Sequence, residues 1–178
     1  FLYNPVSGRG KISKKLDKIV RALEKKYDEV DTYATKCRGD MMLAAANAAE
    51  KYDALIFSGG DGSFNEVVQG VAGASRVPEL GYIPCGTVND IAHSLGIPKR
   101  LSRALKVILT GDSVLLDCMK INDCYAMYIV AAGAFTSATY SAPQDLKHHI
   151  GRIAYGVEGL RKNMKFDVFD IAVNGGAA

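Results

Sequence analysis

The chain has 178 residues, of which 48% are hydrophobic and 23% are charged, and its formal net charge is +3. This composition is typical of a globular protein with a core, and the length allows one domain or one domain and part of another. The mild charge, with no dense basic run among aromatic residues, argues against a nucleic-acid partner. No apolar run reaches the roughly 18 residues of a membrane span, and no signal peptide is recognisable.

The four cysteines form neither a CxxC pair nor a metal-binding spacing with histidine. Unpaired thiols are typical of a reducing compartment. We therefore expect a cytoplasmic protein.

Apolar runs and runs with helical spacing alternate along the first 111 residues. Predicted strands occupy residues 1–3, 28–33, 53–57 and 81–83. Predicted helices occupy residues 12–27, 40–51, 65–71, 91–95 and 101–109. This alternation favours an α/β fold in which helices cover a parallel sheet.

The pattern changes after residue 111. Residues 113–121 and 124–131 are rich in β-formers and are joined by Asn122 and Asp123, which predicts a hairpin. A helix is predicted over residues 143–164 and a strand over 165–173. We therefore expect an α/β domain over residues 1–111 and part of a β-rich second domain over residues 112–178. Because both ends fall beside strand patterns, we also expect the chain to be part of a longer protein.

A glycine-rich stretch, Ser58-Gly59-Gly60-Asp61-Gly62-Ser63, follows the most apolar predicted strand and leads into a predicted helix. Glycines allow backbone amides to approach an anion, and the start of a helix offers unpaired N–H groups. The stretch therefore fits a phosphate-binding loop, although a plain turn is the alternative interpretation.

Two further loops follow predicted strands: Asn4 to Gly8, which we call the first loop, and Pro84 to Asp90, which we call the third loop. The glycine-rich stretch between them in the sequence is the second loop, and Thr35 lies just past another strand. Ligands of open α/β sheets bind at the carboxyl ends of the strands, where all these segments are expected to meet. The sequence contains neither GxGxxG nor GxxxxGK[ST], which disfavours a dinucleotide-binding dehydrogenase and a P-loop NTPase. A phosphate or nucleotide cleft of another type is the prediction.

The motifs NPVSG, GGDGSFNE and PCGTVND, in this order and spacing, resemble the catalytic domain of the diacylglycerol kinase family, particularly its bacterial soluble lipid kinases. The likeness continues through Leu116-Asp117 and the run Ala131–Phe135, and it covers essentially the whole chain. Sphingosine and ceramide kinases share related loops, and NAD kinases share the GGDG core. The motifs are therefore specific for the superfamily and less specific for the substrate.

The resemblance implies a three-layer α/β nucleotide-binding domain of the phosphofructokinase and NAD kinase type, followed by an antiparallel β-sandwich domain. It implies ATP and Mg²⁺ as cofactors, with the nucleotide between the domains. The family's ATP-binding positions are matched by Asn4, Pro5, Val6, Ser7, Gly8, Thr35, Gly59, Gly60, Asp61, Gly62, Ser63, Phe64, Asn65, Glu66 and Thr87. Ser63 stands where threonine is more usual. Asn89 and Asp90 match positions that either brace the third loop or bind directly.

Asp61 is the candidate catalytic residue. A carboxylate would repel phosphate, so it serves either as a ligand of Mg–ATP or as the base that takes the proton of the attacking hydroxyl. The resemblance places the family's main catalytic carboxylate and its structural magnesium site beyond residue 178. No metal ligand is therefore assigned here except Asp61 through Mg–ATP, and we favour this nucleotide-side role.

The leading hypothesis is an ATP-dependent kinase of diacylglycerol or a related lipid alcohol, cytoplasmic and peripheral to the membrane. One alternative is a kinase of a soluble acceptor such as NAD, and another is a nucleotide-binding regulatory module without turnover. The opening NPVSG motif favours the lipid kinases. Whether the protein forms a homodimer is left open.

Overall fold

The computed structural model describes residues 1–130, 172–173 and 176–177. The chain divides into two compact units, Phe1–Tyr128 and Ile129–Ala178. The predicted helix over residues 143–164 and most of the predicted strand over 165–173 lie outside the described residues. The domain boundary between residues 111 and 112 stays a prediction.

A four-stranded parallel sheet forms the centre of the first unit, in the order β2-β1-β3-β4. The strands are β1 (Leu2–Tyr3), β2 (Tyr33–Ala34), β3 (Ala54–Gly59) and β4 (Glu79–Pro84). The expected parallel α/β sheet is thereby confirmed, and each chain segment that follows a strand leaves from the same edge.

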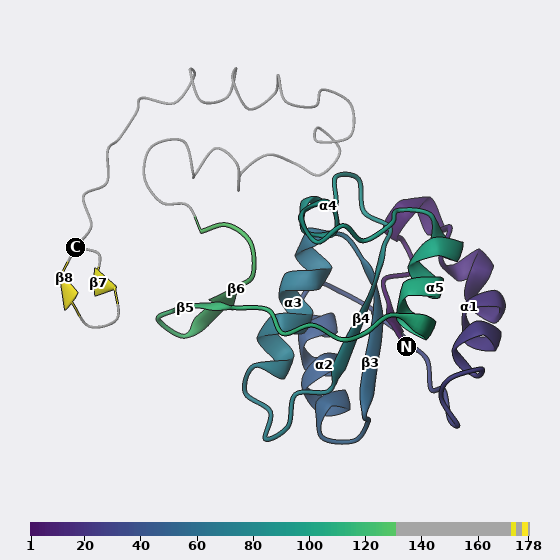
Figure 1. Ribbon diagram of the computed structural model, residues 1–178, viewed down its shortest axis with the longest axis horizontal. Coiled ribbons are helices and arrows are strands. Elements are labelled where there is room, and N and C mark those ends of the chain that lie inside the picture. Colours follow the sequence, from purple (N-terminus) through teal and green to yellow (C-terminus); the bar gives the residue numbers. More distant parts are fainter. Residues whose placement is uncertain (131–171, 174–175, 178) are drawn as a thin grey trace, which may run out of the picture. The chain divides into compact units, whose positions relative to one another are not determined.

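Helices cover both faces of this sheet (Figure 1). One face carries α2 (Asp40–Ala49), α3 (Asp61–Val71) and the short α4 (Asp90–Ser94), and the other carries α1 (Leu16–Leu23) and α5 (Leu101–Thr110). Helices α2 and α3 pack closely because Gly70 has no side chain: a Cβ there would lie 2.3 Å from the Met42 carbonyl oxygen.

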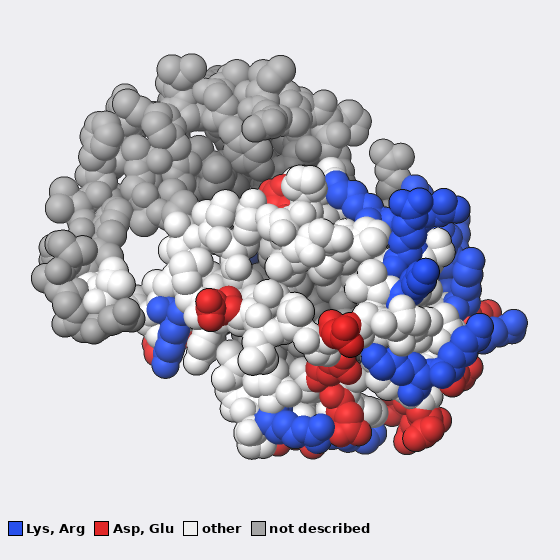
Figure 2. Space-filling view, viewed as in Figure 1, with Lys and Arg blue, Asp and Glu red and all other residues white. Residues whose placement is uncertain are grey.

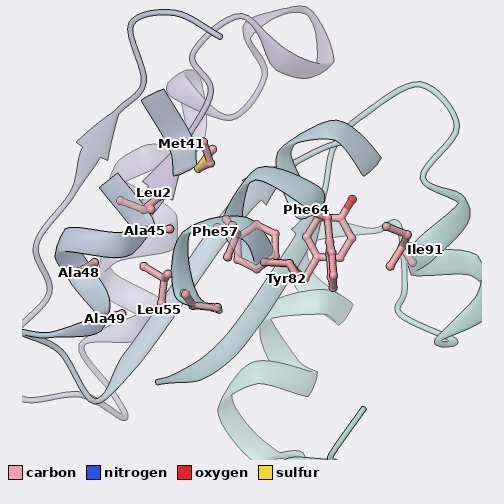
Figure 3. Packing of buried hydrophobic residues seen from close by; sticks show 14 residues of the cluster. Leu2, Met41, Ala45, Ala48, Ala49, Leu55, Phe57, Phe64, Tyr82 and Ile91 are labelled. Atoms are coloured by element: carbon pink, nitrogen blue, oxygen red, sulfur yellow. The ribbon is translucent and has the colours of Figure 1, made fainter. Parts of the chain in front are cut away.

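Two apolar clusters hold the layers together, because successive residues of β3 alternate between the faces of the sheet. Phe57 belongs to the cluster under α2 and α3, and Ile56 to the cluster under α1 and α5. The Phe57 ring stacks on Tyr82 with centroids 5.0 Å apart, and Phe64 meets both rings edge-on (Figure 3). Phe57 is fully buried, so its truncation to alanine should cost about 3–5 kcal/mol.

Several predicted elements are shorter in the structure. A single helix is predicted over residues 12–27, but a 3₁₀ turn η2 (Ser13–Lys15) precedes α1. Helix α1 ends at Leu23, and the residues from there to Tyr27 form hydrogen-bonded turns. The strand predicted over 28–33 pairs only at Tyr33–Ala34, because β1 offers a ladder of two residues. The residues from Asp28 to Thr32 remain outside the ladder.

The helix after β3 begins earlier than predicted, at Asp61 rather than Asn65. Gly60 is in an extended conformation and is the N-cap residue. The glycine-rich stretch is therefore not a loop that precedes the helix, because most of it is the helix's first turn. A second 3₁₀ turn, η1 (Ser7–Gly10), follows β1.

The predicted hairpin is confirmed, although it is shorter than expected: β5 (Met119–Ile121) pairs antiparallel with β6 (Cys124–Ala126). Asn122 of its turn has φ +51°, as tight hairpin turns require. A second antiparallel pair joins β7 (Ala172–Val173) to β8 (Gly176–Ala177). Among the described residues, no helix has the length and apolar character needed to cross a bilayer.

Candidate functional site

The junction of β3 and α3 places free backbone amides at the carboxyl edge of the sheet. The first helical hydrogen bond runs from the Phe64 N–H to the Gly60 carbonyl, at 3.0 Å. The N–H groups of Asp61, Gly62 and Ser63 lie ahead of that bond, at the positive end of the helix dipole. Gly59 makes the sharp turn feasible, since a Cβ there would lie 2.2 Å from the Ser63 Oγ. This helix start is suited to an anion.

The loop after β4 lies directly against this junction. A Cβ on Gly86 would lie 2.5 Å from the Gly60 Cα, so the two glycines bring the two backbones into contact. The N–H groups of Cys85 and Gly86 both donate to the Gly59 carbonyl, at 2.9 and 3.2 Å. The second and third predicted loops therefore form one continuous structure.

Asn89 braces the third loop, which is one of the two roles predicted for it; the other was direct binding of the nucleotide. Its backbone is left-handed, with φ +59°, and its side chain is 3% exposed. The side-chain oxygen accepts the Gly86 N–H at 2.8 Å, and the side-chain nitrogen donates to the Gly86 carbonyl at 2.7 Å. Both polar groups of the amide are thus used to hold the loop in shape.

Asp61 also connects the two loops. Its Oδ1 accepts the backbone N–H of Ile91, in the first turn of α4, at 3.0 Å. The carboxylate therefore acts as a helix cap for α4, which leaves its second oxygen for another partner. A side chain fixed in this way stands beside the amides of its own helix start.

The Tyr82 hydroxyl lies beneath the junction and donates to the Gly59 carbonyl at 3.1 Å. Burial raises the pKa of this hydroxyl, and the negative charge of Asp61 raises it further. The hydroxyl therefore stays protonated and remains a donor. It fixes the carbonyl that also receives the two amides of the third loop.

The first loop lies in contact with the third loop. The Asn4 side-chain oxygen accepts the Val6 N–H at 3.0 Å, which makes a local turn. Gly8 has φ +59°, and a Cβ there would lie 2.7 Å from the Cys85 carbonyl oxygen. Only glycine combines this conformation with this approach. Pro5 and Ser7 belong to the same turn, and Val6 projects into solvent with 77% of its surface exposed.

Thr35 lies one residue beyond the paired residues Tyr3 and Ala34, beside the start of the first loop. Its side chain is buried, and its hydroxyl lies 3.4 Å from the Tyr3 carbonyl. All four predicted segments therefore meet at one edge, as the order of the strands requires. Thr87 and Gly62 are exposed there.

Two of the predicted ATP-binding residues, Phe64 and Glu66, make contacts within the fold. The Phe64 ring is in the core, between Phe57 and Tyr82 (Figure 3). The Glu66 carboxylate accepts the Gly39 N–H at 3.1 Å, which fastens α3 to the turn before α2. Asn65 is exposed on α3. Their contact with a nucleotide stays a prediction.

Sequence reasoning missed Gly86 and Tyr82. The glycine in PCGT was a signal of close backbone approach, whereas nothing in the sequence indicated a buried tyrosine hydroxyl under the loop. The Cys85 sulfur lies 3.3 Å from the Ser58 hydroxyl. Burial raises the pKa of the Cys85 thiol, although hydrogen bonds with Ser58 and Ser7 oppose the rise.

No cluster of three or more His, Cys, Asp or Glu side chains that could hold a metal ion is found in the described part of the chain. A site built from one carboxylate and the oxygens of a bound phosphate needs no such cluster. Asp61, with one oxygen not used by Ile91, is suited to that arrangement.

A family model described as the diacylglycerol kinase catalytic domain matches residues 1–121. The chain belongs to the diacylglycerol kinase catalytic domain family. Diacylglycerol kinases of Staphylococcus aureus strains RF122 and MRSA252 are each 39% identical to it over 173 residues, or 97% of this chain. The resemblance inferred from the motifs is confirmed.

The solved structure of a diacylglycerol kinase from Bacillus anthracis str. Sterne is similar as well, with a TM-score of 0.64 and 33% identity. The match covers 70% of this chain and 46% of that one. The aligned part is 55% of the length of the two Staphylococcus aureus relatives. The chain therefore spans about half the length of the relatives that it matches.

Proposed function

We propose that this chain is the ATP-binding part of a lipid kinase that transfers the γ-phosphoryl group of ATP to the hydroxyl of diacylglycerol or a related lipid. The observation that carries the proposal is the meeting of the α3 amino terminus with the third loop, through Gly60 and Gly86. The family, whose curated members are named diacylglycerol kinases, supports the reaction class.

Phosphoryl transfer depends mainly on positioning and on neutralising the charge of the phosphates. The free amides of Asp61, Gly62 and Ser63 would hold the phosphates, and Asn4 to Gly8 and Thr87 would flank them. Bound Mg²⁺ would supply most of the neutralising charge. The free oxygen of Asp61 would hold the Mg–ATP, while its other oxygen keeps α4 and the third loop in place.

This geometry favours the nucleotide-side role of Asp61 over the role of general base. A general base must reach the proton of the incoming hydroxyl, whereas Asp61 is fixed against Ile91 by its own hydrogen bond. We propose, as the resemblance to the bacterial lipid kinases implies, that the catalytic base is a carboxylate beyond residue 178.

The setting we propose is the cytoplasmic face of a membrane. Lys and Arg side chains gather over α1 and α5 (Figure 2), where exposed basic residues include Lys18, Arg21, Arg103 and Lys106. A basic face is attracted to anionic lipid head groups. The four cysteines are free thiols, which fits a reducing compartment.

A labelling experiment tests the proposal. The full-length protein is incubated with γ-labelled ATP and Mg²⁺, and with either diacylglycerol in mixed micelles or NAD. Label on the lipid is the expected result. Label on NAD alone would assign the protein to a different acceptor, and ATP binding without transfer to either would refute the diacylglycerol kinase activity. The variant Asp61→Ala is the control for label that does not depend on the site.

A further inference from the structure

The side chain of Gln69, near the end of α3, is bonded to both backbone groups of one residue in the hairpin. Its Nε2 donates to the Tyr125 carbonyl, and its Oε1 accepts the Tyr125 N–H at 3.1 Å. One amide side chain thereby makes the same pair of bonds that a neighbouring strand would make. The two residues are 56 positions apart in the sequence.

The pairing in the hairpin explains why the backbone N–H and carbonyl of Tyr125 are free to bind Gln69. Ile121 and Cys124 close the two-residue turn, and the next pair is Lys120 with Tyr125. Hydrogen-bonded and non-hydrogen-bonded pairs alternate in an antiparallel ladder, so the polar groups of Tyr125 point away from β5. Without Gln69 these groups would depend on water.

The hairpin depends on α3 for its position. It forms a separate two-stranded sheet and makes no ladder with the four-stranded sheet. Isolated two-stranded hairpins are marginally stable in water. Besides the bonds of Gln69, Tyr125 and Met127 pack against the apolar cluster that contains Val67 and Val68 of α3.

Helix α3 joins this attachment to the proposed phosphate site, because the same helix begins with the free amides of Asp61, Gly62 and Ser63. The first compact unit ends at Tyr128, just beyond the hairpin. We propose that Gln69 is a positioning residue, which fixes the hairpin, and with it the end of the first unit, relative to the nucleotide-binding end of α3. The effect on turnover rests on the kinase function proposed above, but the attachment itself does not.

Amide hydrogen exchange tests the attachment directly. In the variant Gln69→Ala, the Tyr125 amide should exchange about tenfold faster or more, because it loses its acceptor. The amide of Phe57 in the central sheet should keep its rate. The matched control is Asn47→Ala, which removes an exposed amide side chain from α2. An unchanged rate at Tyr125 would overturn the proposal.

The variant Gln69→Glu provides a second test with a pH readout. A protonated carboxyl group has one donor and one acceptor and can replace the amide, whereas a carboxylate cannot donate to the Tyr125 carbonyl. The folded state therefore favours the protonated form and raises the pKa of the introduced carboxyl above about 4.3. NMR titration of the introduced carboxyl should therefore show a pKa above the unfolded-state value, with the bond to the Tyr125 carbonyl present below that value and lost as pH rises through the folded value. A carboxyl whose pKa is not raised would contradict the paired bonds.

Kinetics of the full-length protein separate positioning from a purely structural role. Gln69→Ala should lower kcat for the lipid about threefold or more while KM for ATP stays within about twofold, since the phosphate-binding amides are untouched. If exchange at Tyr125 rises but kcat does not fall, Gln69 is structural only and the positioning role is refuted. If the wild-type protein labels no lipid, the proposed kinase function fails, whereas the exchange experiment still decides the attachment.

Discussion

The contact between Gly60 and Gly86 yields the sharpest prediction about the site. The variant Gly86→Ala adds one methyl group at a position whose φ does not require glycine, so only the space around it is tested. That methyl carbon would lie 2.5 Å from the Gly60 Cα and 2.8 Å from the Asn89 Oδ1. Carbon atoms in contact lie about 3.5–4.0 Å apart. The two loops must therefore separate by about 1 Å.

The magnitude follows from the contacts that this separation strains. Overpacking of this kind costs about 1–3 kcal/mol. The bonds from the Cys85 and Gly86 amides to the Gly59 carbonyl would lengthen, and each is worth about 0.5–1.5 kcal/mol. We expect the free energy of unfolding to fall by about 2–4 kcal/mol. The separation moves the third loop away from the start of α3, so ATP affinity should fall about tenfold or more.

Urea denaturation and titration with a fluorescent ATP analogue measure the two effects. The matched control is Gly73→Ala, because no atom lies within 4 Å of the added Cβ and its φ is not positive. The control should keep both its stability and its affinity for ATP. If Gly86→Ala binds ATP as the wild type does, the contact between the loops has no part in the site and the reasoning fails.

Three further predictions concern single residues of the site. Gly62→Ala places its Cβ in open space, so stability measured in urea should not fall. ATP binding should weaken, because the methyl group takes up space beside the amides where the phosphates would bind; equal affinity for ATP would argue against phosphate there. Asp61→Asn should lose Mg–ATP binding but keep an acceptor for the Ile91 N–H, whereas Asp61→Ala should also lower the free energy of unfolding by about 0.5–2 kcal/mol. Equal stability of the two variants would contradict the role of Asp61 as a helix cap. At pH 8 iodoacetamide should modify the exposed Cys37 faster than Cys85, whose pKa is raised by burial. Mass spectrometry measures the two rates, and the reverse order would contradict the burial of the Cys85 thiol.

The order of the elements could be predicted because it depends on local patterns. Apolar runs bounded by glycine and polar residues marked the central strands, and the spacing of Ile19 and Leu23 marked the helix that follows the first strand. Parallel pairing then required the loops after the strands to share one edge. The motifs added the family, which the comparisons confirm.

Features that depend on contacts distant in sequence could not be predicted. Asp61 binds an N–H that is 30 residues away, and Gln69 binds one that is 56 residues away. The length of β2 was misjudged because it is set by the two residues of β1 that pair with it. The burial of Phe64 follows from the early start of α3, which places its ring between Phe57 and Tyr82.

The most direct test of the account is to locate the nucleotide by NMR. The ¹⁵N-labelled protein is titrated with Mg²⁺ and a non-hydrolysable ATP analogue, and the shifts of the backbone amides are followed. The account predicts that the largest shifts occur at Asp61, Gly62 and Ser63, with smaller ones from Asn4 to Gly8 and at Thr87. Saturable binding whose shifts avoid the start of α3 would contradict the proposed phosphate site.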